Sequence, residues 1–341
     1  MMDWETDSSL RQRMLLTLAV IAVMPLVFTT TMTLAYNYII APTGHAVGVP
    51  LGPIGFDLRL VFVLTLVGMG LAYIRGGEDA LHSTGAQRVT EDAHPELHRR
   101  LQRLAQTADL PTPDVAVVQS RTPNAYATGR SPETATVAVT TGLLVELDDD
   151  ELDAVLAHEL AHVRNRDTAV MSIAYLLPTF TYVVSALTYR VLTMFLRGLT
   201  RMRTSGRRDG RAIVAFIVLF VVTAAVTITI SAIFWAVSSV LFMVLSQYRE
   251  YAADRGAAAI TGDPLALASA LETIDREMAG LPDRDLRELD GGVEALYISS
   301  LDLPMFNDDE GLHSRLLSQE LFPDSHPPTE ERVERLRDLV G

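Results

Sequence analysis

Uncharged apolar runs occur at four places in the chain: residues 14–40, 60–74, 168–189 and 212–248. An α-helix rises 1.5 Å per residue and the hydrocarbon core of a bilayer is about 30 Å thick, so about 20 such residues cross a membrane. The second run is shorter, but an arginine at each end can extend its side chain to the interface. The fourth run exceeds this length, and we expect its helix to continue into a soluble domain. The pattern therefore predicts four membrane spans.

The arginines that flank the first two runs predict an orientation. Arginines precede the first run and follow the second, whereas the stretch between them has none before Arg59. By the positive-inside rule, both ends of this hairpin lie in the cytoplasm, joined by a short loop at 41–57 that contains Gly and Pro. A cleaved signal peptide is the alternative for the first run, but the length of the run and the lack of a small-residue cleavage site after it disfavour this interpretation.

The linker between the third and fourth runs complicates the orientation of the second pair. It carries six arginines between positions 197 and 211, and such a block should stay in the cytoplasm. The motifs described below require the flanking segments to meet on one side, so two full spans would place this block outside. Either the later pair does not cross fully, or the first hairpin determines the orientation. Arg190 leaves open a span at 172–189 followed by an interfacial basic helix. We predict four spans.

Between the spans, the polar pattern predicts a mainly α-helical domain with a small β-sheet (α+β). Residues 95–105 begin with proline and place leucines at 97, 101 and 104, as in an amphipathic helix. Residues 115–118 and 135–140 have the composition of strands, and 121–129 could add another strand with a turn. Such a sheet could offer an edge to an extended peptide, although a purely structural sheet fits the pattern equally well.

The C-terminal part of the chain is acidic and soluble in character. A helix is predicted to begin at Pro264 and to pack under the site described below. Residues 280–310 are rich in Asp, Gly and Pro, which predicts loops that could form a flap over a cleft. A closing helix at 330–340 places three apolar residues on one face: Val333, Leu336 and Val340.

Residues 148–167 form the predicted helix around which the rest is organised. Asp148 can cap its N-terminus with Glu151 as the capping-box partner, and the acidic first turn suits the helix dipole. Apolar residues recur at steps of three and four and give a stripe for a core: Leu152, Val155, Leu156, Leu160 and Val163.

His158, Glu159 and His162 spell H-E-x-x-H on this helix. Residues four apart lie on one face, so both imidazoles can bind a single ion with Glu159 beside them. Two imidazoles, a carboxylate and an open position are typical of a catalytic zinc site, where zinc lowers the pKa of water and Glu159 transfers its proton to a leaving amine. The pattern also arises by chance on helix surfaces, but the cap and the apolar stripe provide the context that it requires. We predict peptide-bond hydrolysis with one Zn²⁺ per chain, although other divalent ions fit the same ligands.

A third ligand is predicted directly after the fourth apolar run. Glu250 and Asp254 are four residues apart on a predicted helix and share a face. One carboxylate can bind the metal while the other orients an imidazole. The alternative is that Glu250 and Asp254 form a solvated carboxylate pair on a helix surface. Their position at the end of an apolar run, instead of in an acidic stretch, disfavours this alternative.

Composition narrows the class of function. The chain has a net charge of −14, with 42 acidic residues and 28 basic residues, all of which are arginine. The acidic excess argues against a nucleic-acid partner and is typical of salt-adapted proteins, although biased codon usage in an ordinary acidic protein gives the same pattern. The absence of cysteine excludes disulfides and thiol catalysis.

The complete motif set resembles peptidase family M48, the membrane zinc metallopeptidases. It comprises His158-Glu159-Leu160-Ala161-His162, Asn165-Arg166-Asp167, Arg249-Glu250-Tyr251-Ala252-Ala253-Asp254 and His326-Pro327-Pro328-Thr329-Glu330-Glu331-Arg332. Within this family the chain is similar to the HtpX branch, the heat-shock-linked membrane proteases. The resemblance covers residues 85 to 336 approximately, and it implies a zincin-like metalloprotease domain fused to transmembrane helices.

The resemblance also implies roles for individual residues. Glu159 is the general base, and Asp254 steadies a ligand histidine. His326 and Arg332 match a pair near the substrate carbonyl, where they could stabilise an oxyanion. The implied metal ligands are His158, His162 and Glu250. A cleft-lining strand corresponds to Asn124, Ala125, Tyr126 and Ala127.

The family further implies a biological role in the quality control of membrane proteins. HtpX-like enzymes degrade damaged or misassembled membrane proteins, with the active site on the cytoplasmic side of the cell membrane. The implied partners are polypeptide substrates and the lipid bilayer. A Ste24-like prenyl-protein (CAAX) protease shares the motifs but resembles a chain with more spans around a chamber, so four runs favour HtpX. A catalytically silent membrane scaffold is the alternative from another class, and the presence of all three ligands with Glu159 favours the enzyme.

These elements predict four segments along the chain. The first is an N-terminal transmembrane hairpin at 1–75, with spans at about 14–40 and 58–75, and the second is the first part of the metalloprotease domain at 76–168, with the H-E-x-x-H helix. The third is a second transmembrane hairpin at 169–248, with spans at about 170–196 and 212–246 and a basic linker. The fourth is the second part of the metalloprotease domain at 249–341, with the third ligand.

Overall fold

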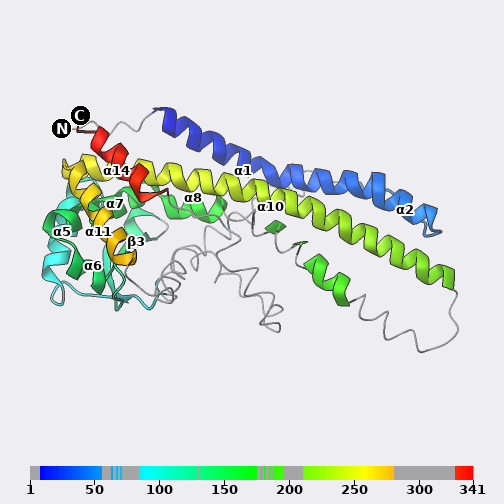
Figure 1. The fold of residues 1–341 in the computed structure, drawn as a ribbon, viewed down its shortest axis with the longest axis horizontal. Coiled ribbons are helices and arrows are strands. Elements are labelled where there is room, and N and C mark those ends of the chain that lie inside the picture. The colour runs from blue at the N-terminus through cyan, green and yellow to red at the C-terminus, as the bar shows by residue number, and fades with distance from the viewer. Residues whose placement is uncertain are drawn as a thin grey trace. The chain divides into compact units, whose positions relative to one another are not determined.

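The computed structural model of the chain divides into two compact units, which we describe separately (Figure 1). Unit 1 comprises Met1–Thr17, Gly70–Ile173 and Phe242–Gly341, and unit 2 comprises Leu18–Met69 and Ala174–Leu241. The structure describes residues 8–55, 84–129, 131–174, 187–194, 210–279 and 327–340, with isolated positions between these ranges.

The first apolar run forms a helix that extends past its predicted end. Helix α1 (Ser8–Ala35) continues through a π-helical turn, η1 (Tyr36–Ile40), into α2 (Ala41–Ala46). The candidate membrane span along it is Gln12–Ala46. The prediction of a loop from residue 41 onward is therefore wrong for its first six residues. Pro42 lies in the first turn of α2, where the fixed φ of proline suits a helix.

The fourth apolar run forms the other candidate span, Ile213–Thr261, within α10 (Gly210–Thr261). Helix α10 is unbroken, in agreement with the expectation that this helix continues beyond the thickness of a bilayer. Large apolar side chains on α1 and α10 are exposed, as expected of surfaces that face lipid; they include Leu16, Val23, Phe216 and Ile233. The predicted span at 58–75 falls largely outside the described residues, and the predicted span at 170–196 is described only in part, at 170–174, 187–194 and a few positions between them.

Aromatic contacts connect three of the apolar runs within unit 2. Phe28 of the first run packs edge to face against Phe180 of the third run and Phe234 of the fourth, with ring centroids 5.8 Å and 5.2 Å apart. Such pairs contribute about 0.5–1.5 kcal/mol each beyond their buried area. They hold these segments together where polar contacts would be costly.

Unit 1 contains the small mixed sheet that the sequence predicts. Its strands are β1 (Gln87–Arg88), β2 (Asp114–Val118), β3 (Ala125–Thr128) and β4 (Thr136–Thr140), in the order β1-β2-β4-β3. Strands β2 and β4 are parallel, and the outer two pair antiparallel with them. The predicted strands are confirmed, and so is the mainly helical α+β class. Strand β3 is the last in the order and, among the residues that the structure describes, pairs with β4 alone.

The two faces of the sheet contribute to two different apolar clusters. Because successive side chains in a strand point to opposite faces, Val115 and Val117 of β2 join the main core together with Val137 and Val139 of β4. The intervening residues Ala116, Val118 and Ala138 form a smaller cluster with Tyr126. The main core is thus the face that the helices cover.

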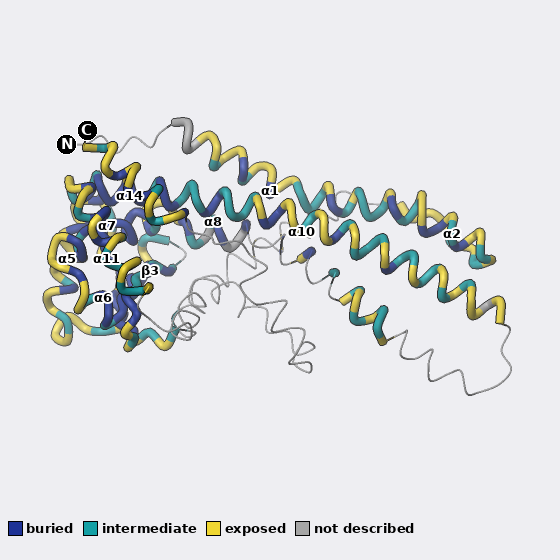
Figure 2. Tube along the Cα trace, in the orientation of Figure 1, coloured by how far each residue is buried: buried dark blue, intermediate teal, exposed yellow. Residues whose placement is uncertain are grey.

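The helices of unit 1 pack on one another around that main core (Figures 1 and 2). They are α5 (Pro95–Thr107), α6 (Thr141–Glu146), α7 (Asp149–Asn165), α11 (Pro264–Ala279) and α14 (Thr329–Asp338). A 3₁₀ turn, η2 (Pro132–Thr134), precedes β4, and a short helix, α8 (Asp167–Ala174), follows α7 along the chain. Helix α7 is central, because it packs against α5, α11 and β3, and α11 in turn packs against α14. The predicted helices at 95–105 and from Pro264 are confirmed. The helix predicted at 148–167 forms as α7, but it ends at Asn165, because Arg166 adopts a left-handed conformation. All five residues of the apolar stripe of α7 are buried.

The closing helix differs from its prediction at its end. Val333 and Leu336 are buried in the main core, as predicted. Helix α14 ends at Asp338, so Val340 lies beyond it and is 57% exposed, and its predicted place on the apolar face is wrong. The predicted loops at 280–310 lie outside the described residues.

We predict that Gly142→Ala destabilises unit 1. Alanine normally improves a helix by about 1 kcal/mol over glycine. In α6, however, a Cβ at Gly142 would lie 2.0 Å from the backbone oxygen of Arg121, so the backbone must shift. Overpacking of this kind costs about 1–3 kcal/mol. We expect a lower midpoint of thermal unfolding for the detergent-purified protein.

The matched control for this prediction is Gly210→Ala. Gly210 begins α10, and a Cβ there meets nothing within 4 Å. This variant should unfold at the wild-type temperature or slightly above it. If both alanine variants behave alike, the close approach at Gly142 does not constrain the fold.

Candidate metal centre

The two ends of α7 fix the helix that carries the H-E-x-x-H residues. At its start, Asp148 Oδ1 accepts hydrogen bonds from the backbone N–H groups of Asp150 (3.0 Å) and Glu151 (2.9 Å). Glu151 Oε2 accepts one in return from the N–H of Asp148 (3.1 Å), which confirms the predicted capping box. At its end, Arg166 has a left-handed φ of 57°, and the chain turns before α8 begins at Asp167.

Glu151 also connects α7 to α11. Its Oε1 accepts hydrogen bonds from Ser269 Oγ (2.6 Å) and Thr273 Oγ1 (3.3 Å). The side chain is buried, so these hydroxyl donors replace the water that its carboxylate would otherwise bind. Helix α11 thus packs on α7, as the sequence analysis expects.

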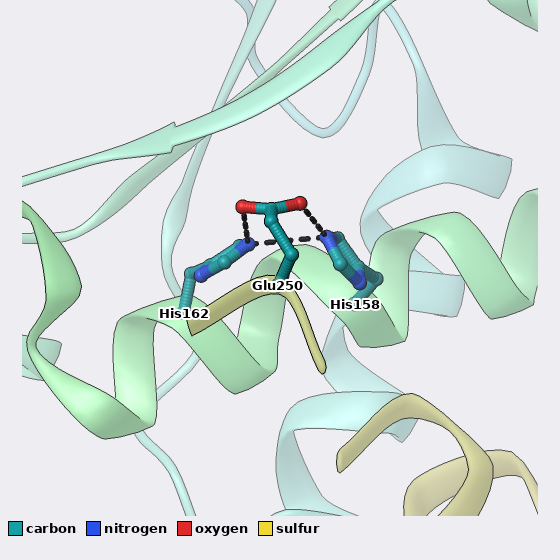
Figure 3. Close-up of side chains that lie close together, drawn as sticks. All are labelled: His158, His162 and Glu250. Carbon is teal, nitrogen blue, oxygen red and sulfur yellow. Dashed lines mark hydrogen bonds and ion pairs between the residues drawn. The ribbon is translucent and has the colours of Figure 1, made fainter. Parts of the chain in front are cut away.

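The structure brings His158, His162 and Glu250 together, with one ligand atom of each within 4.8 Å of the others. Figure 3 shows both imidazoles rising from α7 toward the carboxylate of Glu250, which comes from α10. The two Nε2 atoms are 3.1 Å apart. Glu250 Oε2 is 3.6 Å from Nε2 of His158, and Glu250 Oε1 is 3.5 Å from Nε2 of His162.

These spacings fit the ligands of a single metal ion. Tetrahedral zinc has bonds of about 2.0–2.1 Å to nitrogen, which places two ligand atoms roughly 3.3 Å apart. The three measured separations, 3.1, 3.5 and 3.6 Å, lie near that value. The donor set of two imidazole nitrogens and one carboxylate is also the set that catalytic zinc sites use.

The hydrogen-bond partners of the imidazoles point to the same conclusion. His162 Nδ1 forms a 2.6 Å hydrogen bond with Asp167 Oδ2, and His158 Nδ1 lies 3.0 Å from Asp254 Oδ1. A carboxylate at Nδ1 favours the tautomer that carries its proton there, which leaves a lone pair on Nε2. Two lone pairs and a carboxylate then face one another, an arrangement that a cation between them stabilises.

Two arginines and two aspartates surround these ligands. Arg332 of α14 donates to both oxygens of Asp254, at 2.9 Å and 2.6 Å, and its Nη1 is 3.5 Å from Glu250 Oε2. Arg249 lies 3.5 Å from Asp167 Oδ2 through Nε and 3.5 Å from Glu250 Oε1 through Nη2. Each oxygen of the Glu250 carboxylate therefore faces one histidine and one arginine.

The formal charges of this group favour a divalent cation. Its carboxylates are those of Glu159, Asp167, Glu250 and Asp254, all of them buried. Its two guanidinium groups are those of Arg249 and Arg332, and the carboxylate of Asp254 holds the pKa of Arg332 above its usual range despite burial. Four negative against two positive groups leave two negative charges, which an ion of charge +2 neutralises. A buried charge without such compensation would be costly.

The protonation of His158 depends on the same neighbours. Burial lowers the pKa of its imidazole, but Asp254 and Glu250 outweigh burial and raise the pKa to about 9. A metal ligand must be a neutral imidazole, so binding of a cation displaces this proton. The ion then takes over the compensation of the two carboxylates.

The remaining predicted residues occupy different places. Glu159 is buried beside His158 on α7. Asn124 precedes β3, which contains Ala125, Tyr126 and Ala127. Tyr126 is buried in the smaller cluster, where its hydroxyl contacts Thr84, so its side chain points to the face opposite the main core. His326 lies outside the described residues.

A pocket adjoins His162 at the end of strand β3. It is lined by Thr128, Gly129, Ser131, Ala135, His162, Val163, Arg166 and Thr168. The end of β3 is therefore close to one of the grouped histidines. The strand predicted to line a cleft lies next to the candidate metal centre.

The family model described as Peptidase family M48 matches residues 91–340. The chain belongs to peptidase family M48. Protease HtpX homolog 2 of Methanosarcina acetivorans is 37% identical over 338 residues, which cover 98% of this chain and 97% of that protein. Protease HtpX homolog of Moorella thermoacetica is 36% identical over 335 residues, 98% and 95% of the two chains. The predicted resemblance to HtpX-like M48 proteases is confirmed.

One solved structure is similar at a greater distance. The crystal structure of Ste24p from S. mikatae has 18% identity and a TM-score of 0.41, and the match covers 93% of this chain and 67% of that one. The identification of the branch rests on the HtpX homologues. This member of family M48 is a metallopeptidase, and its two candidate spans indicate a membrane protein.

Asp167 and Arg249 are the two charged residues of this centre for which the sequence predicted no role. Both belong to motif stretches of family M48, but only their contacts distinguish them from other charged residues. The one signal in the sequence is their position, since Arg249 precedes Glu250 and Asp167 follows His162 by five residues.

We predict that Arg332→Leu strongly destabilises the metal-free protein. The variant leaves the buried carboxylate of Asp254 without its arginine and leaves Glu250 with Arg249 alone, and breaking a buried pair in this way costs about 3–5 kcal/mol. Arg337→Leu, on the same helix, removes only an exposed pair with Glu272 and should cost less than about 1 kcal/mol. Thermal unfolding of both variants without added metal measures the difference. Equal losses would contradict a structural role for the buried pair.

Proposed function

We propose that this protein is a zinc endopeptidase whose single ion is held by His158, His162 and Glu250. The observation that carries the proposal is that the ligand atoms of these three side chains lie within 4.8 Å of one another. Both histidines come from the capped, buried helix α7, which also carries Glu159. Imidazole and carboxylate donors suit zinc, and the chain contains no thiolate that would close the site. Zinc, when bound, supplies a Lewis acid that polarises a carbonyl and lowers the pKa of water.

We propose that Glu159 is the general base of hydrolysis. Its carboxylate takes the proton of the attacking water and delivers it to the leaving amine. Burial supports this role, because a carboxylate shielded from bulk water keeps its proton near the reacting atoms. Asp254 orients His158 through its contact with Nδ1, and Arg332 holds Asp254 in place by donating two hydrogen bonds to its carboxylate.

The substrate backbone, we propose, lies along strand β3. This strand has a neighbour on one side only within the described sheet, so its free edge can pair with an extended peptide. The predicted cleft residues Asn124, Ala125, Tyr126 and Ala127 all belong to this strand or precede it. The roles of His326 and Arg332 near the substrate carbonyl remain part of this proposal. For Arg332, the 3.5 Å contact to Glu250 supports a position beside the metal.

We further propose a multi-pass protein of the cell membrane with its active site in the cytoplasm. Two candidate spans, the remaining apolar runs and the arginines around the first hairpin support this topology. Substrates would be membrane proteins that are damaged or misfolded. Two observations support membrane proteins as substrates. The helix that carries Glu250 also contains an apolar run, and the similar proteins from Methanosarcina acetivorans and Moorella thermoacetica are HtpX homologues.

The decisive variant is Glu159→Gln. It removes the base and leaves the three metal ligands in place, so we expect proteolysis of casein or a membrane-protein substrate to fall by at least 10²–10⁴-fold. Bound zinc should stay at about one ion per chain. Proteolysis and metal content are measured on the same detergent-purified samples.

The control for this variant is Glu146→Gln. Glu146 is exposed at the end of α6, and its substitution should change neither the activity nor the zinc content. The proposal fails if wild-type protein binds no zinc, or if Glu159→Gln cleaves as fast as the wild type.

The proposed topology can be tested with single cysteines, because the natural chain has none. Gly52 lies exposed after the first candidate span, and Gln102 lies exposed on α5. A membrane-impermeant maleimide should label Gly52→Cys in intact cells and Gln102→Cys only after lysis. Labelling of Gln102→Cys in intact cells would contradict a cytoplasmic active site.

A further inference from the structure

The contacts of Glu250 divide the metal centre into two similar halves. In one half, Oε2 faces His158, whose Nδ1 lies against Asp254, and Asp254 is held by Arg332. In the other, Oε1 faces His162, whose Nδ1 binds Asp167, which lies against Arg249. Each ligand histidine thus has its own aspartate, and each aspartate has its own arginine.

We infer that Asp167 and Arg249 are positioning residues for the ligands His162 and Glu250. Asp167 fixes the tautomer and the ring orientation of His162, and Arg249 holds the Glu250 carboxylate at the shared metal position. The inference rests on the proposed zinc site and adds a second aspartate–arginine pair to it. Neither residue need contact substrate for this role.

The surroundings of Asp167 are unfavourable for stability alone. Its side chain is 2% exposed, and its Oδ1 is buried with no hydrogen-bond partner in the part of the chain that the structure describes. Burying a carboxylate with one unsatisfied oxygen is costly. The 2.6 Å hydrogen bond from His162 uses the other oxygen, and it is the contact through which the charge acts on the metal centre. Carboxylates behind ligand histidines commonly orient them and increase their basicity.

The position of Asp167 depends on the left-handed turn at Arg166. In a continuous α-helix, a residue five positions after His162 would point about 140° away from it, since each residue turns by about 100°. The φ of 57° at Arg166 ends α7 and redirects the chain, so that Asp167 reaches Nδ1 of His162. A non-glycine residue seldom adopts this conformation, which costs about 1–2 kcal/mol. The unfavourable backbone conformation at Arg166 is therefore what brings the Asp167 carboxylate to Nδ1 of His162.

Arg249 is suited to connect the two elements. Its Nε is 3.5 Å from Asp167 at the junction of α7 and α8, and its Nη2 is 3.5 Å from Glu250 on its own helix, α10. A planar guanidinium can face two carboxylates with separate N–H groups, whereas a lysine ammonium acts as a single point charge. Arg249 also reduces the repulsion between the two carboxylates, which would otherwise drive Glu250 away from the imidazoles.

The first test is Asp167→Asn in the detergent-purified full-length protein. Asparagine has nearly the same shape but no charge, and its amide N–H can face Nδ1 and so allow the tautomer that places a proton on Nε2 of His162. We expect the affinity for Zn²⁺, measured by competition with a chelator, to fall by about 10–100-fold. The absorption spectrum of the Co²⁺-substituted protein should also change, because it reports the geometry of the ligands.

Arg249 provides an independent second test. Arg249→Gln should weaken Zn²⁺ binding, and Arg249→Lys should restore part of the affinity because it keeps the charge without the fork of N–H groups. If Asp167→Asn fails to fold, this pair of variants still tests the inference. Equal affinities for the wild type, the glutamine variant and the lysine variant would overturn the role of Arg249.

The matched control is Asp153→Asn, the same substitution on α7. Asp153 is also mostly buried and paired with arginines, Arg100 and Arg103, but it contacts no ligand of the metal. It should lower the thermal unfolding midpoint of the metal-free protein and leave the Zn²⁺ affinity and the Co²⁺ spectrum unchanged. A purely structural role would give Asp167→Asn the same result.

The outcomes separate this inference from the proposed function. If wild-type protein binds Zn²⁺ and Asp167→Asn binds it within twofold of the wild-type affinity, the inference about Asp167 is overturned and the zinc site stands. If wild-type protein binds neither Zn²⁺ nor Co²⁺, the proposed function fails and this inference fails with it. A loss of affinity in Asp167→Asn but not in Asp153→Asn supports both.

Discussion

Repulsion among the groups of the metal centre is the constraint on which the rest of unit 1 depends. Two imidazole nitrogens lie 3.1 Å apart, and a carboxylate lies within 3.6 Å of both. Three further carboxylates are buried around them, and a low dielectric strengthens every such repulsion. Two arginines offset half of this charge, and the proton on His158, whose pKa is raised to about 9, offsets part of the rest until a cation displaces it. The fold must supply the remaining force that holds the ligands together until a cation neutralises them.

That force comes from the apolar side of α7. Leu156 and Leu160 are fully buried in the main core, while the histidines occupy another face of the same helix. Burial of such side chains contributes about 1.5–3 kcal/mol each. The capping box at Asp148 fixes the residue at which α7 begins, and the hydrogen bond between Glu151 and Ser269 fixes the packing of α11 against α7. Helix α7 can present two ligands because its other contacts are strong and independent of the metal.

The sequence predicted the parts of this arrangement that local spacing determines. The helix, its cap, its apolar stripe and the paired histidines follow from periods of three and four residues, and the strands follow from alternation. Glu250 is far from the histidines along the chain, so no period relates them. Its place directly after an apolar run predicted a carboxylate ligand there, and the family resemblance then distinguished Glu250 as the ligand from Asp254. The contacts of Asp167 could not be predicted, because no sequence pattern forces Arg166 into a left-handed conformation. The prediction of a loop from residue 41 was wrong because proline disrupts the interior of a helix but is tolerated in its first turn, and Pro42 lies in the first turn of α2.

The separation of the ligands along the chain has a mechanical consequence. Residues 249–254 of α10 supply Arg249, Glu250 and Asp254, whereas both histidines come from α7. The metal would therefore connect two segments that two apolar runs separate in sequence. Because a helix turns by about 100° per residue, a slip of α10 by one residue would carry Glu250 away from the imidazoles and Asp254 away from His158. The apolar run and the ligands share this one unbroken helix, so the insertion or deletion of one residue between them would rotate Glu250 by about 100° relative to the apolar run. The register of α10 is therefore a constraint that the metal centre and the apolar run share.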